Sequence, residues 1–338
     1  MIESNISLKN YNTFGLDVIA ASFSRIENKK QVLDLIKHEF PNYHKRLFLG
    51  GGSNLLFLQN YEGLVIKNEI KGIEIEKKTD EFVFVKSYSG TWWHDLVMYC
   101  VKANLGGIEN LSLIPGTVGA APMQNIGAYG VEIKDTFEAL EAIDLETGRT
   151  VVFKNSECNF AYRESIFKQT HKNKYFIYSV TFRLRKKPIL NLNYGDIQQK
   201  LHEKKCLNPT IKDVSEAIID IRNSKLPDPK VIGNAGSFFK NPEVEKEIYL
   251  ELLESFPQMP KYELPNGKVK IPAGWLIEQC GFKGKINGNT GNHAQQALVI
   301  VNYGKATGVE IYDHSLLVQK TVKEKFGIVL SAEVNLIG

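Results

Sequence analysis

The pattern of hydrophobic and polar positions predicts a chain in which short strands alternate with helices. Apolar runs of about four to eight residues are typical of strands, and an apolar spacing of about three to four residues is typical of amphipathic helices. The predicted strands before residue 190 are 18–23, 46–49, 64–67, 72–76, 82–88, 139–145, 150–153 and 178–184. Helices are predicted for 29–40 and for 92–101, where Thr91 is the expected N-cap.

The last third of the chain is predicted to form a separate region. Residues 192–209 are polar and irregular, so we place the main domain boundary near residue 210. Beyond it, the pattern predicts helices at 213–222, 244–253, 273–280 and 310–326, and strands at 297–302 and 329–336. The expected division is therefore 1–70 and 71–210, followed by a C-terminal domain over 211–338.

Length and charge restrict the class of protein. A chain of 338 residues exceeds what one ordinary hydrophobic core fills, which supports more than one compact unit. The net charge of +4 comes from 42 basic and 38 acidic residues that are dispersed along the chain, so we expect no nucleic-acid partner. No apolar run approaches the roughly 20 residues of a membrane span, and the polar start lacks a signal-peptide pattern. We therefore expect a cytoplasmic protein with no membrane partner.

The cysteines and histidines give no sign of metal or triad chemistry. Cys100, Cys158, Cys206 and Cys280 lie far apart and form no CxxC motif, so we expect reduced and mostly buried thiols. The histidines are equally scattered, and their spacing indicates neither a metal site nor a Ser-His-Asp triad. No metal ion is expected.

Two glycine-rich segments are the strongest candidates for a binding site. Residues 50–54, Gly-Gly-Gly-Ser-Asn, follow a predicted strand, so successive backbone N–H groups can converge on an anion such as a pyrophosphate. This segment matches neither G-x-G-x-x-G nor the P-loop, and a tight turn without a ligand stays an alternative. Residues 114–130 form a longer stretch of small residues with few charges, which suits a flat, extended ligand or a structural Ω-loop.

These segments closely resemble the UDP-N-acetylenolpyruvoylglucosamine reductase family, also called the UDP-N-acetylmuramate dehydrogenases. The resemblance begins at 12–15, Asn-Thr-Phe-Gly, and includes both glycine-rich segments. It continues through 162–168, 225–229, 233–242 and 273–278 and ends at Glu333, so it covers essentially the whole chain. Residues 192–197, Leu-Asn-Tyr-Gly-Asp-Ile, resemble the tyrosine loop of the longer subtype of the family. Two places depart from the usual pattern, namely Ala332, where a proline often stands, and the looser match at 288–293.

The resemblance implies a fold and a reaction. The implied fold is α+β, with a two-part FAD-binding domain of the vanillyl-alcohol-oxidase (PCMH) type over 1–70 and 71–210 and a substrate-binding domain over 211–338. FAD is bound noncovalently, and NADPH is the co-substrate. The implied reaction is the reduction of UDP-N-acetylglucosamine enolpyruvate to UDP-N-acetylmuramate, a cytoplasmic step of peptidoglycan precursor synthesis. We expect the enzyme to be a monomer.

The implied reaction needs three kinds of residue, and the resemblance assigns one residue to each. Hydride addition to a vinyl carboxylate builds negative charge toward the carboxylate, which the planar guanidinium of Arg163 can bind through two oxygens. Ser237, in a glycine-flanked loop, is the expected proton donor to the adjacent carbon. Glu333 is expected near the enolpyruvyl group, which it helps to polarise. Taken singly, Arg163 would be read as a structural ion pair and Ser237 as a cap or turn residue.

The remaining site residues are also implied by the resemblance. Lys225 and Asn241 are candidates for the UDP diphosphate. The other expected substrate contacts are Tyr162, Tyr194, Tyr262 and Gln296, with Tyr194 closing over the nucleotide sugar. The expected FAD-binding residues are Asn12, Thr13, Gly50, Gly51, Gly52, Ser53, Asn54, Pro115, Gly116, Gly119, Ala120, Gln124, Asn125, Gly127, Ala128 and Tyr129.

Two other functions stay as alternatives. One is a flavin oxidase of related fold, in which oxygen accepts the electrons and the cofactor is often attached through histidine. No histidine lies in or beside 50–54, which counts against covalent attachment. The other is a UDP-sugar-binding module without enzymatic activity, which would not need the flavin loops together with Arg163, Ser237 and Glu333.

Overall fold

The computed structural model describes residues 1–338, which form two compact units. Unit 1 comprises Met1–Ile6, Ala20–Gly51 and Glu62–Ser224. Unit 2 comprises Ser7–Ile19, Gly52–Tyr61 and Lys225–Gly338. Two short segments near the N-terminus therefore belong to the same unit as the C-terminal third. The three-part division at residues 70 and 210 stays a prediction.

The first sheet has the strand order β1-β2-β5-β3 and contains the parallel pair of β3 and β5. Its strands are β1 (Glu3–Ser7), β2 (Ile19–Ile26), β3 (Arg46–Leu49) and β5 (Tyr61–Asn68). The predicted helix 29–40 is confirmed as α1 (Lys29–Asp34), a π-helical turn (Leu35–Glu39) and a 3₁₀ turn (Phe40–Asn42). Asn28 caps α1 by accepting a hydrogen bond from the Gln31 N–H at 3.0 Å.

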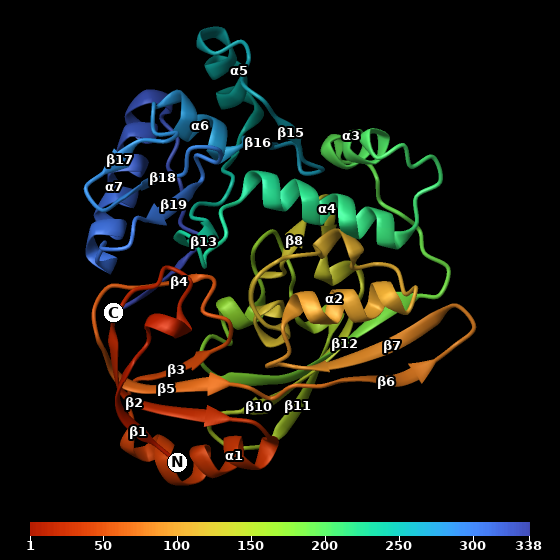
Figure 1. The fold of residues 1–338 in the computed structure, drawn as a ribbon, viewed down its shortest axis with the longest axis vertical. Coiled ribbons are helices and arrows are strands. Elements are labelled where there is room, and N and C mark those ends of the chain that lie inside the picture. The colour runs from red at the N-terminus through yellow and green to blue at the C-terminus, as the bar shows by residue number, and fades with distance from the viewer. The chain divides into compact units, whose positions relative to one another are not determined.

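The second sheet of unit 1 has the order β11-β10-β12-β7-β6, and its neighbouring strands are antiparallel. Its strands are β6 (Ile73–Lys78), β7 (Phe82–Tyr88), β10 (Phe137–Asp144), β11 (Thr150–Lys154) and β12 (Tyr175–Arg185). Helix α2 (Trp93–Lys102) lies across one face of this sheet (Figure 1), and its apolar side chains share one buried core with the strands. The predicted strands 72–76 and 82–88, and likewise 139–145 and 150–153, therefore pair as antiparallel hairpins.

The start of α2 differs from the prediction. The N-cap residue is Trp92, and no side chain caps the helix. The Thr91 hydroxyl instead accepts from the Gly72 N–H at 3.0 Å and donates to the Gly72 carbonyl at 3.2 Å. Thr91 as the N-cap is therefore wrong, because a residue distant in sequence takes up its hydroxyl.

Helix α3 (Gly195–Glu203) lies within the segment that was predicted to be irregular. Its two buried side chains, Ile197 and Leu201, are spaced four residues apart and pack against the apolar face of α4 (Ile211–Lys225). Tertiary packing therefore stabilises a helix whose own sequence is mostly polar. The prediction of irregular structure is wrong for these residues.

Short elements order the connecting segments. A hairpin pairs β8 (Gly127–Ala128) with β9 (Val131–Glu132). The 3₁₀ turns of the remaining loops are Lys9–Tyr11, Glu109–Leu111, Val118–Ala120, Pro122–Gln124, Ile133–Asp135, Asn155–Glu157 and Ile166–Lys168. The small-residue segment 114–130 is thus a pair of 3₁₀ turns followed by a hairpin strand.

Unit 2 contains a sheet of order β13-β19-β18-β17 and a smaller one of order β14-β16-β15. The strands are β13 (Gly233–Ser237), β14 (Glu243–Val244), β15 (Tyr262–Glu263), β16 (Val269–Lys270), β17 (Ile286–Asn287), β18 (Thr290–Asn292) and β19 (Val299–Asn302). The helices are α5 (Lys246–Ser255), α6 (Ala273–Gln279) and α7 (Gly308–Phe326). A capping box of Thr307 and Glu310 begins α7, and Gly327, at φ +69°, ends it.

The C-terminal strand is shorter than predicted. Only β20 (Asn335–Ile337) forms a regular ladder, in parallel with β4 (Leu55–Phe57). Residues 331–333 instead run beside 238–240, where Lys240 N–H donates to Ser331 O at 2.9 Å and Glu333 N–H donates to Phe238 O at 2.8 Å. A single strand over 329–336 is therefore wrong, because the chain changes its pairing partner within that range.

Two other sequence expectations concern thiols and membrane spans. All four cysteines are free thiols, with Cys100 and Cys158 buried and Cys206 and Cys280 partly exposed. Burial is therefore confirmed for two of the four. None of the helices combines the length and the apolar character that crossing a membrane requires.

Candidate active site

Two glycine segments of unit 1 meet at the end of β3. A Cβ atom on Gly51 would lie 2.9 Å from the Cα atom of Gly116, and one on Gly50 would lie 2.5 Å from Oγ1 of Thr117. Neither position therefore accommodates a side chain without movement of the other segment. The two segments therefore approach each other closely at the glycines, while their approach to an anion stays a prediction.

The residues that follow this turn belong to unit 2. Thr13 N–H donates to Gly52 O at 3.1 Å, and Gly52 has φ +64°, a conformation that favours glycine. The buried Asn12 side chain donates to the carbonyls of Leu8 and Leu16 at 2.8 and 2.9 Å. Asn12 therefore braces its own loop. Next in the chain after Ser53, the side chain of Asn54 donates to Glu333 O at 3.3 Å.

Asn125 links the small-residue segment to its neighbours in unit 1. It is fully buried in a left-handed conformation at φ +43°. Its amide nitrogen donates to Glu132 Oε2 at 2.9 Å and to Ala161 O at 3.1 Å, and its oxygen accepts from the Lys134 N–H at 3.2 Å. The local role of Asn125 is therefore structural. The small-residue segment 114–130 also contains five more of the predicted cofactor residues, namely Pro115, Gly119, Ala120, Gln124 and Ala128.

Arg163 lies on a tight turn. Ala161 and Glu164 exchange both backbone hydrogen bonds at 3.1 Å, which leaves Tyr162 and Arg163 at the tip, with Arg163 at φ +56°. Nη2 of Arg163 donates to Gly127 O at 2.9 Å, and its guanidinium lies 5.7 Å from the ring centre of Tyr162. The turn therefore fixes the guanidinium beside the β8 strand.

Arg222, on α4, is a residue that the sequence analysis missed. Its Nε is buried without a hydrogen-bond partner, and its guanidinium donates to the Tyr129 hydroxyl. Burial lowers the pKa of Arg222, Tyr129 opposes this shift, and the charge of nearby Arg163 adds to it. The sequence did contain a signal that could have identified Arg222. It lies four residues after Ile218, so it is a charged residue on the apolar face of the predicted helix. Unit 1 thus holds two neighbouring guanidinium groups.

Tyr194 lies beside the same cluster. Its ring contacts that of Tyr129 edge-on at a centroid distance of 5.4 Å, and it is 37% exposed at the start of α3. Asn110 donates to Tyr129 O and to Asn191 O, both at 3.0 Å, which ties the β8–β9 turn to the segment before α3. Unit 1 therefore carries three predicted site residues, Tyr162, Arg163 and Tyr194, and of these the Tyr194 ring contacts Tyr129.

In unit 2 the structure brings Ser237 and Glu333 together. Ser237 ends β13 after an irregularity in which Gly236, at φ +71°, donates its N–H to Asn234 Oδ1 at 2.9 Å. The next residue, Phe238, is buried and accepts from the Glu333 N–H at 2.8 Å. The serine and the glutamate therefore lie one residue apart across this pairing.

The other predicted substrate residues are spread over unit 2. Asn241 Oδ1 accepts from the Ala273 N–H at 2.9 Å and so caps α6. Gln296 Oε1 accepts from the Leu298 N–H at 3.4 Å. Tyr262 is 49% exposed on β15, and Lys225 is the exposed last residue of α4.

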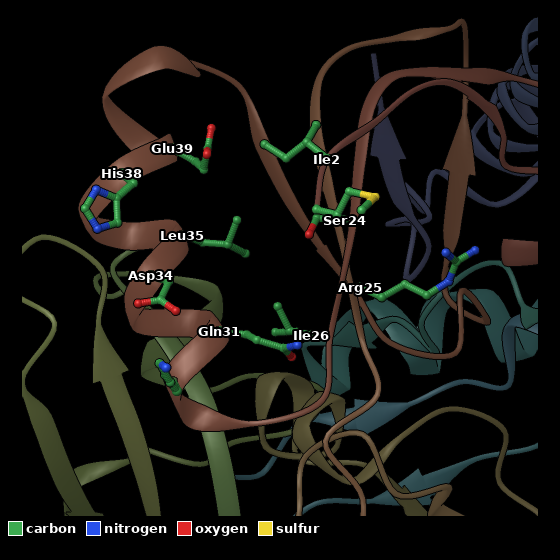
Figure 2. Close-up of a pocket in the computed structure, with 11 residues that line it drawn as sticks. Ile2, Ser24, Arg25, Ile26, Gln31, Asp34, Leu35, His38 and Glu39 are labelled. Atoms are coloured by element: carbon green, nitrogen blue, oxygen red, sulfur yellow. The ribbon is translucent and has the colours of Figure 1, made fainter.

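A cavity of about 580 Å³ lies elsewhere in unit 1. Figure 2 shows its lining, in which Leu35 and Ile26 face each other between the π-helical turn and β2. Its polar side chains have both signs of charge, including Asp34 and Lys30, and Arg25 forms a 2.6 Å ion pair with Glu3. None of the predicted site residues lines it, so it is not the predicted site.

Comparisons with known proteins agree with this arrangement. Residues 228–337 match the family model described as UDP-N-acetylenolpyruvoylglucosamine reductase, C-terminal domain, and residues 21–154 match that of an FAD binding domain. The UDP-N-acetylenolpyruvoylglucosamine reductase of Flavobacterium johnsoniae is 52% identical, and that of Amoebophilus asiaticus is 45% identical, each over 99% of both chains. The crystal structure of the reductase from Thermus caldophilus is 23% identical, with a TM-score of 0.70 over 100% of this chain and 99% of that one.

These matches span the chain and include both units. The α+β fold with an FAD-binding domain followed by a C-terminal domain, as expected from the sequence, is confirmed. The FAD expectation is confirmed as well. The chain therefore belongs to the UDP-N-acetylenolpyruvoylglucosamine reductase family and has FAD as its cofactor.

Proposed function

We propose that the chain reduces UDP-N-acetylglucosamine enolpyruvate to UDP-N-acetylmuramate with NADPH, a step of peptidoglycan precursor synthesis. Its relatives, named as reductases of the enolpyruvoyl sugar, match over almost the whole chain. The single structural observation that carries the proposal is the placement of Ser237 one residue from Glu333 in the family's C-terminal domain. Bound FAD supplies a hydride carrier between NADPH and the vinyl group.

The residues of the glycine segments fit a dinucleotide. A Cβ atom on Gly50 would meet Oγ1 of Thr117, and one on Gly51 would meet Gly116 and the Trp92 ring, so only glycine fits at these two positions. Because the turn carries no side chains of its own at these positions, its N–H groups can approach a diphosphate closely. We assign FAD binding to this turn and to the segment from Pro115 to Tyr129.

The guanidinium pair of unit 1 supports an anion site. Arg222 forms no ion pair, and a buried cation without a counter-ion is unfavourable. A substrate carboxylate would compensate that charge and accept hydrogen bonds from Arg163 and Arg222. Arg163 is therefore our candidate for holding the carboxylate as negative charge develops on it.

The serine and the glutamate of unit 2 divide the remaining chemistry. The Ser237 hydroxyl donates the proton that completes the reduction, since its neighbour Gly236 allows close approach of a ligand. Glu333 acts beside it, held by its backbone bond to Phe238. A carboxyl group next to a substrate carboxylate favours its protonated, donating form.

We assign the nucleotide half of the substrate to polar residues that are exposed or half-buried. Lys225 and Asn241 are candidates for the diphosphate, and the Asn241 oxygen already caps α6, which leaves its amide nitrogen as the donor. Tyr162, Tyr262 and Gln296 are further candidates, and Tyr194 is proposed to close over the sugar as in the longer subtype. We further propose that the enzyme acts in the cytoplasm as a monomer, which sedimentation at several concentrations tests.

Anaerobic spectroscopy tests the function as a whole. The purified protein is expected to be yellow and to release free flavin when it is denatured. NADPH is expected to bleach the flavin band, and the enolpyruvyl nucleotide sugar is expected to restore it without oxygen. A colourless protein that takes up no FAD contradicts the proposal. Restoration by oxygen but not by the sugar would support the oxidase alternative.

A further inference from the structure

Lys67 is a cation placed directly behind the glycine turn. It lies on β5, and its Nζ donates to the Gly50 carbonyl at 2.7 Å. The same ammonium lies 5.8 Å from the ring centre of Trp92. Lys67 forms no ion pair with a carboxylate, and its side chain is half-buried. Its positive charge is therefore offset only in part, by the nearby carboxylate of Glu69.

The residues around Lys67 connect its ammonium group to the glycine turn. A Cβ atom on Gly51 would lie 2.9 Å from both the Trp92 ring and Gly116. Trp92 pairs with Thr117, and the Trp93 N–H donates to Gly116 O at 3.0 Å. The ammonium, the aromatic ring and both glycine segments thus contact one another within unit 1.

A half-buried cation in this position favours an anionic ligand. Burial lowers the pKa of Lys67, nearby Glu69 opposes this shift, and Lys71 adds to it. The diphosphate is the anionic group of FAD, and a diphosphate on the turn would stabilise the ammonium. Lysine binds phosphate as a point charge and does not require direct bidentate geometry.

We propose that Lys67 is the positioning residue of the FAD diphosphate. Its hydrogen bond fixes the Gly50 carbonyl and so the direction of the turn, and its charge attracts the diphosphate from behind that turn. The proposal rests on the assignment of the glycine turn to FAD.

Two substitutions separate the effect of the Lys67 charge from that of its hydrogen bond to the Gly50 carbonyl. Lys67→Gln keeps an N–H donor for the Gly50 carbonyl but removes the charge, whereas Lys67→Arg keeps both. The dissociation constant of FAD from the apoprotein is measured by fluorescence titration at about 50 mM and about 500 mM salt. We expect Lys67→Gln to raise that constant at least about tenfold, as for a lost charged contact, and to flatten its salt dependence. Lys67→Arg is expected to stay within about threefold of the unmodified protein.

Lys86 provides the matched control. It is another partly buried lysine of unit 1, on β7, but it pairs with Glu141 at 2.7 Å. Lys86→Gln is expected to lower the melting temperature of the apoprotein without changing FAD affinity or its salt dependence. The proposal is wrong if Lys67→Gln, like Lys86→Gln, leaves the dissociation constant of FAD unchanged. It is also wrong if that constant depends on salt as steeply in Lys67→Gln as in the unmodified protein.

A third variant tests the assignment on which the proposal rests. Gly51→Ala places a Cβ atom against Gly116 and should weaken FAD binding whatever Lys67 does. If Gly51→Ala and Lys67→Gln both leave FAD affinity unchanged, the turn is not the FAD site. If only Lys67→Gln is without effect, the turn assignment stands and the role of Lys67 is overturned.

Discussion

At the scale of single residues, unusual backbone conformations position the side chains proposed for catalysis. Arg163 has φ +56° at the tip of a two-residue turn, and Gly236 has φ +71° directly before Ser237. Non-glycine residues rarely adopt such angles unless the surroundings hold them. Here the paired backbone bonds of Ala161 and Glu164 do so for Arg163. The identity of these residues followed from sequence motifs, but the local hydrogen bonds that hold their backbone, Ala161 with Glu164 and Gly236 with Asn234, were not predicted from the hydrophobic pattern.

The assignment of Ser237 as proton donor predicts a loss confined to one half-reaction. Ser237→Ala should reduce its flavin with NADPH at a near-normal rate and then reoxidise about 10²–10⁴ times more slowly with the enolpyruvyl sugar. Ser237→Cys, which keeps a donor, should recover part of the rate. Stopped-flow absorbance of the flavin measures both steps. The exposed Ser331, whose carbonyl binds Lys240, supplies the control Ser331→Ala. Reoxidation of Ser237→Ala at the wild-type rate would make Glu333 the better candidate.

We expect the replacement of Arg222 to have opposite effects on the stability of the apoprotein and on the rate of the reaction. Because its guanidinium is buried without a carboxylate partner, Arg222→Gln should leave the free energy of unfolding of the apoprotein unchanged or raise it. The same change should slow flavin reoxidation by the nucleotide sugar about tenfold or more, since it removes a charged donor. Urea unfolding and stopped-flow absorbance measure the two effects. The control is Arg183→Gln, which removes a half-exposed guanidinium 3.9 Å from Glu138. A large loss of apoprotein stability would indicate a structural role for Arg222.

At the scale of elements, hydrophobic periodicity predicted strands and helices wherever burial comes from the element's own pattern. Strand β7 alternates buried and half-buried residues along its whole length, and its predicted bounds agree with the structure. Helix α3 shows why other elements were missed. Only Ile197 and Leu201 of its nine residues are buried, and both depend on contacts with α4. Nine mostly polar residues with two buried apolar side chains are too few to show a helical period in the sequence.

The position of Tyr194 at the start of α3 predicts that its substitution affects binding of the nucleotide sugar alone. Its partly exposed ring contacts that of Tyr129 at a centroid distance of 5.4 Å. A residue that closes over the sugar, as we propose for Tyr194, should contact mainly the second substrate. Tyr194→Ala should weaken binding of the nucleotide sugar and leave flavin reduction by NADPH nearly intact. Leu201→Ala, which loosens α3 and costs about 2–5 kcal/mol, should weaken sugar binding as well but should also lower the unfolding temperature. Equal losses in both half-reactions of Tyr194→Ala would point to a folding role.

At the scale of the whole molecule, each family match lies mostly or wholly within one unit. The FAD-binding match covers 21–154, mostly within unit 1, and the reductase-specific match covers 228–337, within unit 2. Local patterns could not predict that Ser7–Ile19 and Gly52–Tyr61 join unit 2. That outcome depends on long-range pairing such as β4 with β20, whose residues Leu55 and Asn335 are opposite each other. The cost of closing such a loop grows slowly with its length, so sequence separation gives little guidance.

Unit 2 also contains a histidine that predicts how stability depends on pH. His314 on α7 is buried, its Nε2 lies 2.7 Å from Asn292 Oδ1, and burial lowers its pKa from 6.5 to about 4, with Lys285 adding to the shift. The folded protein therefore keeps His314 neutral, while the unfolded chain takes up a proton below about pH 6.5. The resulting stability is complete above about pH 6.5 and is lost progressively as the pH falls toward about 4.

Urea unfolding between about pH 7.5 and about pH 4.5 measures this slope, which one histidine sets at no more than about 1.4 kcal/mol per pH unit. His314→Gln keeps a hydrogen-bonding side chain for Asn292 but does not titrate, so its stability should depend less on pH than that of the unmodified protein. The exposed His202 on α3 provides the control His202→Gln, which should retain the full slope. Because burial also lowers the pKa of two half-buried histidines, His293 and His94, His314→Gln should remove only part of the slope. An unchanged slope in His314→Gln would show that the neutral histidine is not what couples the folding of unit 2 to pH.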